Sequence, residues 1–557
     1  MALFTADFET TTDPTDCRVW ACGICEIGNP DNFTHFNDID GFIKWARLQR
    51  KVTTYFHNLK FDGEFILCWL FENGFKFVSD RRDLEKDTFT TLISDKGQFY
   101  SMKVCFERKG KEKECLTIYD SLKILPFSVA AIAKGFNLPI SKLEIDYHET
   151  REKGHILTQE EVDYLRNDVE IMARALHILF EQGLTKMTQG SNALYDYKRT
   201  VGTKNFSKWF PIPEYDSDIR QSYKGGFTYL NPKYKEMDLQ DGIVLDVNSL
   251  YPSVMYYQPL PYGEGIFFKG KYEPDKIYNL HVQMFTCQFE LKPGYIPTIQ
   301  LKNNLAFVPT QYLESSDGED VTLCLTNVDM DLFFEHYKVY NIEWHSGWKF
   351  KSTVGLFKEY IDKWNKVKME STINGNKAMR TLAKLMLNAL YGKFALNPNV
   401  QGKIPWYDNG VVKYKLGEKE TRDPIYIPVG TFITAWARYK TISSAQKVYD
   451  RFVYADTDSL HLIGTDIPDM LEVDPVKLGA WKHESTFTRA RFIRQKSYIE
   501  EIDGVLNITC AGMPDRCYQY VTWENFHTGM SYDGKLGMTH VNGGIVLKDI
   551  PFSIKSA

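Results

Sequence analysis

The stretches VLDVNSLYPSVMY (residues 244–256) and VYADTDSLHL (residues 453–462) carry the strongest fold signal in this chain. In the first, an apolar run precedes Asp246, so this carboxylate is expected at the end of a buried strand. In the second, alternation places Asp456 and Asp458 on one side of a predicted hairpin. Burying like charges this close together is costly unless cations neutralise them. The two stretches therefore predict a metal-binding site on a sheet and disfavour a purely structural role for the acids.

A stripe of polar residues on a predicted helix lies between those two stretches. In LAKLMLNALYGKF, residues Lys384, Asn388 and Tyr391 fall at helical spacing, and Arg380 extends the stripe by one turn. Cations that hold phosphates, followed by an aromatic ring near the base, suit a nucleoside triphosphate. The alternative is a surface stripe on a bundle helix.

Four further acids come from three segments nearer the N-terminus. FTADFET places Asp7 and Glu9 two residues apart on a predicted strand, and therefore on one face. FHNLKFDGEF adds Asp62, and YLRNDVE adds Tyr164 and Asp168, four residues apart on a predicted helix. Carboxylates suit Mg²⁺, and two such ions about 4 Å apart can activate water against a phosphodiester. The alternative is that each acid caps a helix or lies on the surface.

The composition predicts a folded protein of several domains. The chain has 557 residues, of which 43% are hydrophobic and 14% aromatic, so disorder is excluded. A net charge of −5 excludes a uniformly basic surface, but two stretches are locally basic. Residues 361–393 hold seven Lys/Arg against two acids, and residues 477–496 hold six against one, so each carries +5. Because both contain aromatic residues, phosphate contact is favoured over a solvated basic face.

Neither a membrane span nor a leader is expected. No run of 18 apolar residues exists, and the start MALFTADFET lacks the basic and apolar regions of a signal peptide. Ten scattered cysteines include one CxxC, Cys22 and Cys25, for which ordinary strand positions are favoured over a zinc site. These features predict a reducing compartment and a cytoplasmic protein.

Periodicity and turn residues predict the local structure of most segments. One long helix is expected at about residues 159–183, and two helices joined by the polar turn STINGN are expected within 356–394. An Asn409–Gly410 turn predicts a hairpin. The remaining expectations are strands and loops at 257–355, a helix at 428–447, and a strand-like C-terminus with turns at Asp533–Gly534 and Gly543–Gly544.

The motifs DxxSLYP, KxxxNxxYG and YxDTDS resemble motifs A, B and C of family B DNA polymerases. The N-terminal acids, in their order and spacing, resemble the three motifs of DEDD-type 3′→5′ exonucleases. Further matching pieces are YKGG at 223–226, TAWAR at 434–438, WKHES at 481–485 and KSY at 496–498. Together these resemble the protein-primed branch of the family, the phi-29-like phage replicases, over nearly the full chain. Ala389 departs from the serine often found in motif B.

The resemblance implies an α/β multidomain fold. An RNase H-like 3′→5′ exonuclease domain would precede a right-hand polymerase of palm, fingers and thumb with two insertions. The implied domains are exonuclease 1–185, first palm part 186–256, first insertion 257–355, fingers 356–394, second insertion 395–427, second palm part 428–504 and thumb 505–557. The first insertion would dock a protein primer. The second would help to encircle DNA and displace the non-template strand.

The resemblance also implies roles for residues of the polymerase site. Asp246 would bind both metals with the backbone of Val247, Asp458 would be the other main ligand, and Asp456 the less certain catalytic member. Tyr251 would exclude a ribose 2′-OH. The incoming dNTP would contact Tyr251, Lys384, Arg380, Lys368, Asn388 and Tyr391. Thr434 and Arg438 would touch the template strand, and Lys496 and Tyr498 would steady the primer terminus. Further DNA contacts would come from Tyr223, Gly225 and Gly226.

In the exonuclease half, the resemblance implies that Asp7, Glu9, Asp62 and Asp168 hold the metals. Tyr164 would orient the attacking water and Lys142 would stabilise charge at the scissile phosphate. The frayed 3′ end would be gripped by Thr10, His57, Asn58, Phe61, Phe65, Ser121 and Leu122.

The expected cofactor is Mg²⁺, with Mn²⁺ as an alternative, at two ions per active site. Expected partners are primer-template and single-stranded DNA, dNTPs, a terminal protein that acts as primer, and a single-stranded DNA-binding protein. The implied function is processive, strand-displacing phage DNA replication with proofreading, in the cytoplasm of a bacterial host.

Three alternatives remain open on sequence alone. A proofreading exonuclease with an inactive polymerase module is disfavoured because Asp246, Asp456, Asp458 and Lys384 are all present. An RNA polymerase is disfavoured by Tyr251 and the DTDS turn. A non-enzymatic single-strand binding or packaging protein would need basic and aromatic grooves, but no convergent acids.

Overall fold

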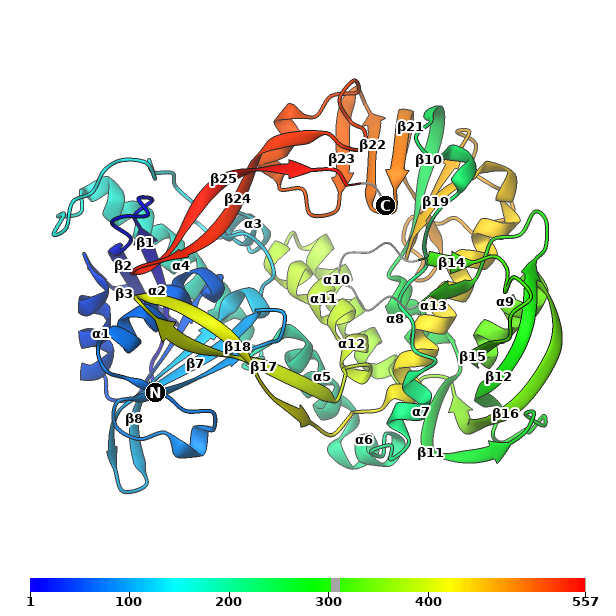
Figure 1. The fold of residues 1–557 in the computed structure, drawn as a ribbon, viewed down its shortest axis with the longest axis horizontal. Helices are drawn as coiled ribbons and strands as arrows, with labels where there is room; N and C mark the ends of the chain where they lie inside the picture. The colour runs from blue at the N-terminus through cyan, green and yellow to red at the C-terminus, as the bar shows by residue number, and fades with distance from the viewer. Residues whose placement is uncertain (302–310, 556–557) are drawn as a thin grey trace.

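A computed structural model describes residues 1–301 and 311–555, and Figure 1 shows their arrangement. The N-terminal part is built on an eight-stranded sheet in the order β3-β2-β1-β4-β8-β7-β6-β5, in which β1, β4 and β8 are parallel neighbours. Its strands are β1 (Leu3–Thr10), β2 (Val19–Glu26), β3 (Asn29–Phe36), β4 (Val52–Phe56), β5 (Lys76–Phe77), β6 (Thr88–Ile93), β7 (Phe99–Lys109) and β8 (Glu112–Asp120). Its helices are α1 (Ile39–Leu48), α2 (Leu59–Glu72), α3 (Val129–Gly135) and α4 (Gln159–Glu181), which confirms the predicted long helix.

Helix α4 begins with a capping box, since the side chain of Thr158 accepts from Glu161 and the carboxylate of Glu161 accepts in return. It packs across β1 and β2 and buries Leu165, Val169 and Leu176. This packing determines which residues on the α4-facing side of β1 lie close to residues of α4.

A second sheet is wholly antiparallel and lies at the right of Figure 1, with strand order β23-β22-β21-β10-β20-β19-β9. Its strands are β9 (Thr228–Leu230), β10 (Asp238–Val247), β19 (Phe452–Asp456), β20 (Ser459–Ile463), β21 (Trp481–Arg494), β22 (Ser497–Ile502) and β23 (Val505–Cys510). Helices α8 (Leu250–Tyr257) and α13 (Ile427–Lys447) pack together beneath it, and α13 confirms the helix predicted at 428–447. The buried strand predicted before Asp246 is also confirmed, because Ile243 and Leu245 are fully buried.

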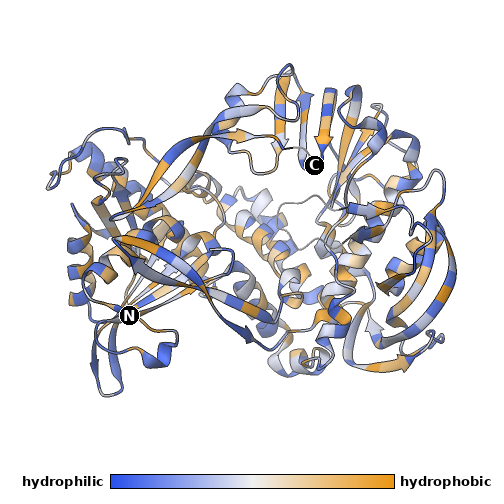
Figure 2. Cartoon of the chain, viewed as in Figure 1, coloured by the Kyte–Doolittle hydropathy of each residue, from blue (hydrophilic) through white to orange (hydrophobic). Residues whose placement is uncertain are grey.

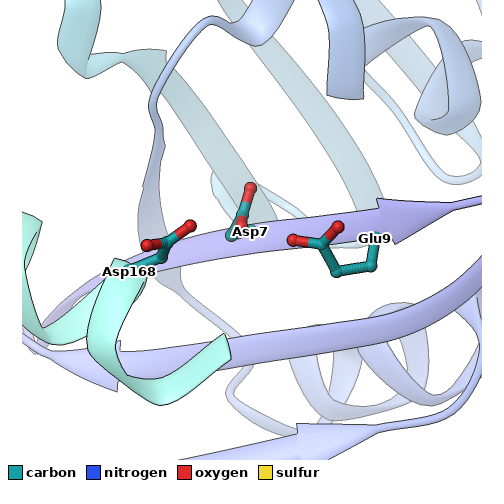
Figure 3. A group of neighbouring side chains, drawn as sticks. All are labelled: Asp7, Glu9 and Asp168. Carbon is teal, nitrogen blue, oxygen red and sulfur yellow. The ribbon is translucent and has the colours of Figure 1, made fainter. Parts of the chain in front are cut away.

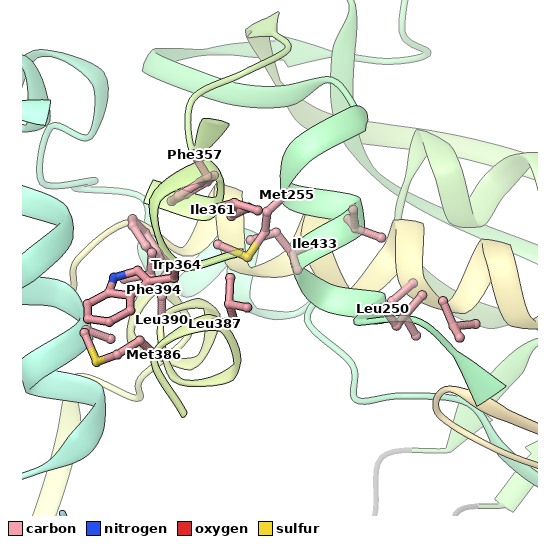
Figure 4. Close-up of a cluster of buried hydrophobic side chains, with 14 of the residues drawn as sticks. Leu250, Met255, Phe357, Ile361, Trp364, Met386, Leu387, Leu390, Phe394 and Ile433 are labelled. Carbon is pink, nitrogen blue, oxygen red and sulfur yellow. The ribbon is translucent and has the colours of Figure 1, made fainter. Parts of the chain in front are cut away.

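A helical layer joins the two sheets. It contains α5 (Gln189–Val201), α6 (Thr203–Trp209), α7 (Asp216–Arg220), α10 (Lys358–Ile373), α11 (Lys377–Ala389) and α12 (Tyr391–Phe394), which confirms the two helices predicted around STINGN. Apolar side chains of α8, α10, α11 and α13 interlock there (Figure 4). Within this core the indole of Trp364 donates to Asp196 at 2.7 Å, and the Tyr360 hydroxyl donates to the Met386 carbonyl at 2.6 Å.

The segment 257–355 forms a four-stranded sheet, β11-β16-β12-β15. The strands are β11 (Leu260–Lys269), β12 (Leu280–Leu291), β15 (Val321–Thr326) and β16 (Tyr337–Thr353), with the small hairpin β13 (Ile299–Leu301) and β14 (Gln311–Leu313). The predicted strands and loops are confirmed, but one helix, α9 (Asn327–His336), was not expected. Its apolar residues do not form a regular helical stripe, and Thr326 caps its start. Residues 302–310 of this segment lie outside the described residues.

Two long hairpins project from the second half of the chain toward the N-terminal sheet (Figure 1). The hairpin predicted at Asn409–Gly410 is confirmed as β17 (Asn399–Asp408) and β18 (Val411–Thr421), with φ of 48° and 86° at the turn. The other is β24 (Ser531–Val541) and β25 (Gly544–Ser553), whose turn confirms Gly543–Gly544. The turn predicted at Asp533–Gly534 is wrong: these residues form a bulge within β24, because Gly534 takes a positive φ without reversing the strand.

The remaining short elements are 3-10 turns at Arg81–Asp83, Ser121–Lys123, Pro232–Tyr234, Tyr449–Arg451 and Asp515–Tyr520. Hydrophobic residues lie mostly where sheets and helices face one another in the interior (Figure 2). Across 1–301 and 311–555, we find no helix with the length and apolar character needed to span a bilayer.

Two candidate carboxylate sites

The first site forms where β1 meets α4. Asp7 and Glu9 point to the same side of β1, and Asp168 approaches from α4, so that carboxylate oxygens of the three lie within 4.8 Å of one another (Figure 3). The alternation of the strand and the packing of the helix thus bring together residues that are about 160 positions apart. Asp62 comes from the first turn of α2 and is 3% exposed; its charge raises the pKa of Glu9, and the charge of Asp7 raises the pKa of Asp62.

The electrostatics of this site fit a divalent cation. Burial, followed by the charge of Asp168, raises the pKa of Asp7 to about 7. Burial and the neighbouring carboxylates also raise the pKa of Glu9 and Asp62 well above their usual range. Within the described part of the chain, one buried oxygen of Asp62 and one of Asp168 have no hydrogen-bond partner. Hard oxygen donors that are buried, mutually repelling and partly unsatisfied are a donor set suited to Mg²⁺ or Mn²⁺.

A lysine and two tyrosines flank the carboxylates. The ammonium of Lys142 donates to Asp168 at 2.7 Å and to the Tyr164 hydroxyl at 3.3 Å. Burial alone would lower the pKa of Lys142, but Asp168 raises it above the ordinary value, so the lysine stays charged. Tyr147 was missed by the sequence reasoning although it lies five residues from Lys142. Its hydroxyl is 2.6 Å from that of Tyr164, and its side chain is exposed beside the acids.

The residues expected to grip a 3′ end lie around the carboxyl edge of the sheet. His57 is 2.9 Å from the Ser121 hydroxyl and 2.6 Å from the Phe127 carbonyl. Asn58 adopts a positive φ at the start of α2, and Thr10 ends β1. One further residue, Asp120, was missed: its buried carboxylate accepts from the backbone N–H groups of Asn58 and Leu122, both at 3.0 Å.

The two phenylalanines of this set differ. Phe61 is half-buried, whereas Phe65 is 2% exposed and packs beneath Gly544 at the tip of the β24–β25 hairpin. Their ring centroids are 5.6 Å apart. Phe61 is therefore open to a stacked base, while Phe65 supports it from below.

The second site lies at the end of β10. Asp246 closes this strand, and Asp458 occupies the turn between β19 and β20, where its carbonyl accepts from the N–H of Val247 at 2.8 Å. Burial, then Asp458 and Glu484, raise the pKa of Asp246 to about 6. The structure thus brings Asp246, Val247 and Asp458 together, and their oxygens are again suited to a hard cation.

Asp456 was expected on the same side as Asp458; the structure places Asp456 at the end of β19 and Asp458 in the turn that follows, and after burial the charge of Asp456 raises the pKa of Asp458. Thr457 has a φ of 55°, so the tight turn breaks the two-residue period of the strand. The carboxylate of Asp456 accepts from Lys496 at 2.8 Å and from the Thr228 hydroxyl at 3.1 Å. Tyr498 lies nearby, stacked on Phe492 with centroids 4.8 Å apart.

The predicted cationic stripe runs along the exposed side of α11. Arg380, Lys384 and Asn388 are exposed there. Lys368 of α10 lies nearby: burial lowers the pKa of Lys368, and the charge of Lys384 lowers it further. A cavity of about 550 Å³ between α3 and α11 is lined by Lys384 and Asn388. Beyond the stripe, the ring of Tyr391 stacks on Tyr251 with centroids 4.0 Å apart and an interplanar angle of 14°.

Thr434 and Arg438, expected at the template, are buried in α13 with exposures of 1% and 2%. The guanidinium of Arg438 pairs with Asp329 at 2.8 Å and donates to the carbonyls of Lys224 and Gly225. The structure therefore does not place these two side chains on an open surface. Arg438 instead holds the loop that contains Tyr223, Gly225 and Gly226.

Comparisons with known proteins agree on one family. The family model described as "DNA polymerase type B, organellar and viral" matches residues 43–474. The chain is 51% identical to the DNA polymerase of Bacillus phage M2 and 50% identical to that of Bacillus phage phi29, over 99% of each chain. The DNA polymerase of Streptococcus phage Cp-1 is 33% identical over 99% of this chain and 98% of its own.

Solved structures agree with these relatives. Phi29 DNA polymerase in an orthorhombic crystal form matches with a TM-score of 0.96 at 49% identity, covering both chains completely. The phi29 enzyme complexed with primer-template DNA and incoming nucleotides matches with a TM-score of 0.94 over the same extent. The chain therefore belongs to the organellar and viral type B DNA polymerases, and within them to the phi29-like phage DNA polymerases.

Proposed function

We propose that this DNA polymerase replicates a phage genome and proofreads its own product, with synthesis at Asp246 and Asp458 and 3′→5′ hydrolysis at Asp7, Glu9, Asp62 and Asp168. The observation that carries the proposal is that one chain holds two separate clusters of mutually repelling carboxylates, a largely buried one where β1, α2 and α4 meet and a more open one at the end of β10. The second is linked to the exposed cations of α11 through Lys482, whose charge acts on both Asp246 and Lys384. One site is thus suited to a nucleoside triphosphate and the other to a bare phosphodiester.

In synthesis, Asp246, Asp458 and the Val247 carbonyl would hold divalent ions, which when bound supply charge neutralisation and activation of the primer 3′-hydroxyl. Lys384, Arg380 and Lys368 bind the phosphates of the dNTP. The Tyr251–Tyr391 stack forms a flat, rigid wall on which the nucleotide rests, and Tyr251 excludes a 2′-hydroxyl by its bulk. Asn388 contacts the nascent pair, while Asp456 orients Lys496 at the primer terminus through their ion pair.

In proofreading, the four N-terminal carboxylates would hold divalent ions, which when bound lower the pKa of the attacking water and stabilise the leaving oxygen. Tyr164 orients that water, and Lys142, kept charged by Asp168, stabilises the phosphate. Phe61 stacks on a frayed base, and His57, Asn58, Ser121, Leu122 and Thr10 hold the strand. Asp120 keeps Asn58 and Leu122 in place.

The domain boundaries given above are proposed as they stand, with segments 257–355 and 395–427 as the two insertions of a protein-primed polymerase. The β17–β18 hairpin supports this, because it reaches from the base of the helical layer to the N-terminal domain. We propose that a terminal protein docks on the first insertion, and that the enzyme displaces the non-template strand with help from a single-stranded DNA-binding protein. The proposed location is the cytoplasm of a bacterial host.

A 5′-labelled primer on a longer template, incubated with Mg²⁺ with and without dNTPs, tests both activities on one denaturing gel. Extension with dNTPs and a degradation ladder without them are expected. Asp458→Ala should abolish extension and leave degradation, and Asp7→Ala combined with Glu9→Ala should do the opposite. Loss of both activities in either variant would contradict two independent sites.

A second prediction separates the DNA polymerase from an RNA polymerase. Wild-type enzyme should reject ribonucleotides, because the ring of Tyr251 is locked by its stack on Tyr391. Tyr251→Val should admit them, raising ribonucleotide insertion by about 100-fold or more while dNTP insertion falls less than that, since a steric block is worth several kcal/mol. Equal insertion of both sugars by the wild type would exclude this role.

A further inference from the structure

A lysine of the second sheet, on strand β21, lies directly opposite Asp246, the carboxylate that ends β10. In the pairing of β10 with β21, Asp246 is opposite Lys482. Directly opposed residues of an antiparallel pair project to the same side of the sheet, with Cβ atoms about 5 Å apart. Lys482 therefore faces the same space as Asp246; in the sequence it lies within the basic stretch 477–496 and the WKHES segment at 481–485, neither of which indicates a role for this lysine by itself.

A bulge sets this side chain at its position. Val244 pairs with Ser485 and Leu245 with His483, so Glu484 is the extra residue on β21. Bulges re-aim side chains beside functional sites. Here the bulge leaves both Lys482 and Glu484 close enough to Asp246 to act on its pKa, in opposite directions.

Within the described residues, Lys482 makes no strong ion pair. Its ion pair with Glu484 is 3.7 Å long, with the two side chains 46% and 49% exposed. Such an exposed pair contributes little to stability. The ammonium can therefore turn toward a better anion.

Lys482 also belongs to a group of cations that converge from two domains. After burial, the charges that lower the pKa of Lys384 are Arg380 and Lys482, and Lys482 acts on Lys368 in the same direction. Cations of α10, α11 and β21 thus act on one another, while Lys482 has a weak, half-exposed ion pair with Glu484; a polyanion would stabilise such a group.

We propose that Lys482 binds the β- and γ-phosphates of the incoming dNTP from the palm side, opposite Arg380, Lys384 and Lys368, and then the pyrophosphate that leaves. This inference rests on the proposed function of the Asp246 site. In the reaction the primer 3′-hydroxyl gives up its proton to water and its oxygen forms a bond to the α-phosphorus as the bond to the bridging oxygen breaks, and pyrophosphate departs with that electron pair. Lys482 donates hydrogen bonds to its oxygens and transfers no proton.

The test compares single-nucleotide insertion by wild type, Lys482→Ala and Lys482→Arg at saturating Mg²⁺. Lys51→Ala is the matched control, because Lys51 also makes a weak surface pair, 3.5 Å from Glu112 with 47% of its side chain exposed. The KM for dNTP should rise about 10-fold in Lys482→Ala with kcat within about twofold, as expected for loss of a charge-assisted contact. Inhibition by added inorganic pyrophosphate should weaken by a similar factor. Lys482→Arg should restore both values to within about threefold, and Lys51→Ala should change neither.

Degradation of a single strand by the same preparations reports whether each variant is folded. Unchanged KM and unchanged pyrophosphate inhibition in Lys482→Ala would overturn the proposal. So would a variant whose only change is the Mg²⁺ concentration for half-maximal rate, since Lys482 would then serve Asp246 and Glu484 alone. If the wild-type protein degrades single strands but extends no primer, the proposed function of the Asp246 site is wrong. This outcome differs from the two results that would overturn the role of Lys482, since both of those require an active wild type.

Discussion

At the scale of single residues, both candidate sites contain carboxylates whose charged form is disfavoured in the folded protein. Burial raises the pKa of Asp7 to about 7 and that of Asp246 to about 6, and in each case a second carboxylate adds to the effect. A folded protein that holds protons on such groups loses stability as they are removed. Binding of a divalent cation offsets this loss, so function and stability are linked through the metal.

Asp7→Asn should therefore stabilise the metal-free protein. Since the folded pKa of Asp7 lies above its unfolded value of 3.8, the folded state binds more protons between about pH 4 and pH 7, and its stability falls as pH rises across that window. The penalty above pH 7 is on the order of 4 kcal/mol. Thermal melts in EDTA should show a higher Tm for Asp7→Asn than for wild type at pH 8 and little difference at pH 4.

Metal addition provides the control for this prediction. Mg²⁺ at pH 8 should raise the Tm of wild type more than that of Asp7→Asn, because the variant has lost one anionic ligand. An advantage of Asp7→Asn that is as large at pH 4 as at pH 8 would mean that ionisation of Asp7 is not its source.

At the scale of elements, the β19–β20 turn shows how a local conformation decides a site. The alternation of VYADTDSLHL indicates two strands, but it cannot show that Thr457 has a positive φ or that Asp456 pairs with Lys496. Three contacts set this turn: the N–H of Thr457 donates to Phe227, the Thr441 hydroxyl donates to the Thr457 carbonyl, and Gly226 approaches the Thr457 side chain. The loop before β9 thus positions the turn that carries Asp458, more than 200 residues away in sequence.

Gly226→Ala should impair synthesis through this contact. A Cβ at this position would lie 2.5 Å from the Thr457 hydroxyl and 2.8 Å from its methyl group, so the turn that carries Asp458 must shift. We expect kcat for insertion to fall by about 10-fold or more, because misplacement of a ligand by 1 Å can cost about 100-fold. Degradation at the N-terminal site should be unchanged in the same assay.

A second substitution makes this prediction specific. Thr457→Gly removes the three atoms nearest to the new Cβ and is compatible with the positive φ. The double variant should therefore insert nucleotides faster than Gly226→Ala alone. If it is as slow or slower, crowding against Thr457 is not the cause.

At the scale of the whole molecule, one buried carboxylate joins three distant parts of the chain. Glu64 of α2 is 3% exposed, and its Oε1 accepts from the Tyr414 hydroxyl of β18 at 2.7 Å and lies 3.2 Å from Nε2 of His540 in β24. Both hairpins thereby close onto the N-terminal domain, as Figure 1 shows. The hydrogen bond to Glu64 raises the pKa of His540, so the protonated ring is favoured in the closed form.

Glu64→Ala should release both hairpins. Removal of the acceptor leaves the Tyr414 hydroxyl and His540 without their buried partner, which costs about 1–3 kcal/mol. Faster hydrogen exchange of β18 and β24 and shorter products on a long template are expected, with single-nucleotide insertion retained. Glu72→Ala is the matched control, because Glu72 accepts from Tyr407 at an exposed part of the same interface.

The same contact should depend on pH. Its contribution is fully present below the ordinary His pKa of about 6.5 and is lost as pH rises through the higher value that His540 has in the fold. Exchange of β24 should therefore speed up on going from pH 6 to pH 8 beyond the intrinsic change, and Glu64→Gln should abolish that excess. A wild type and a Glu64→Gln variant with the same pH profile would contradict a role for His540.

The sequence by itself determined the family and most local structure of this protein. Short motifs such as DTDS and SLYP are contiguous, and a strand or helix period can be read without knowing what packs on it, so the acids, the α11 stripe and the hairpin turn at Asn409 could all be predicted. Helix α9 was missed because its apolar residues form no regular helical stripe. The bulge at Gly534 was predicted to be a turn because an Asp-Gly pair is compatible with both.

Tertiary structure alone decided which of these residues meet, because contacts between distant segments depend on register and packing that no local pattern contains. Only the fold places Lys482 across from Asp246, through a bulge on β21, and only the fold buries Arg438 against Asp329. It likewise turns Asp456 toward Lys496 and brings Tyr414 and His540 to Glu64. Distances between side chains are set by how whole sheets and helices pack, and their chemistry follows from those distances.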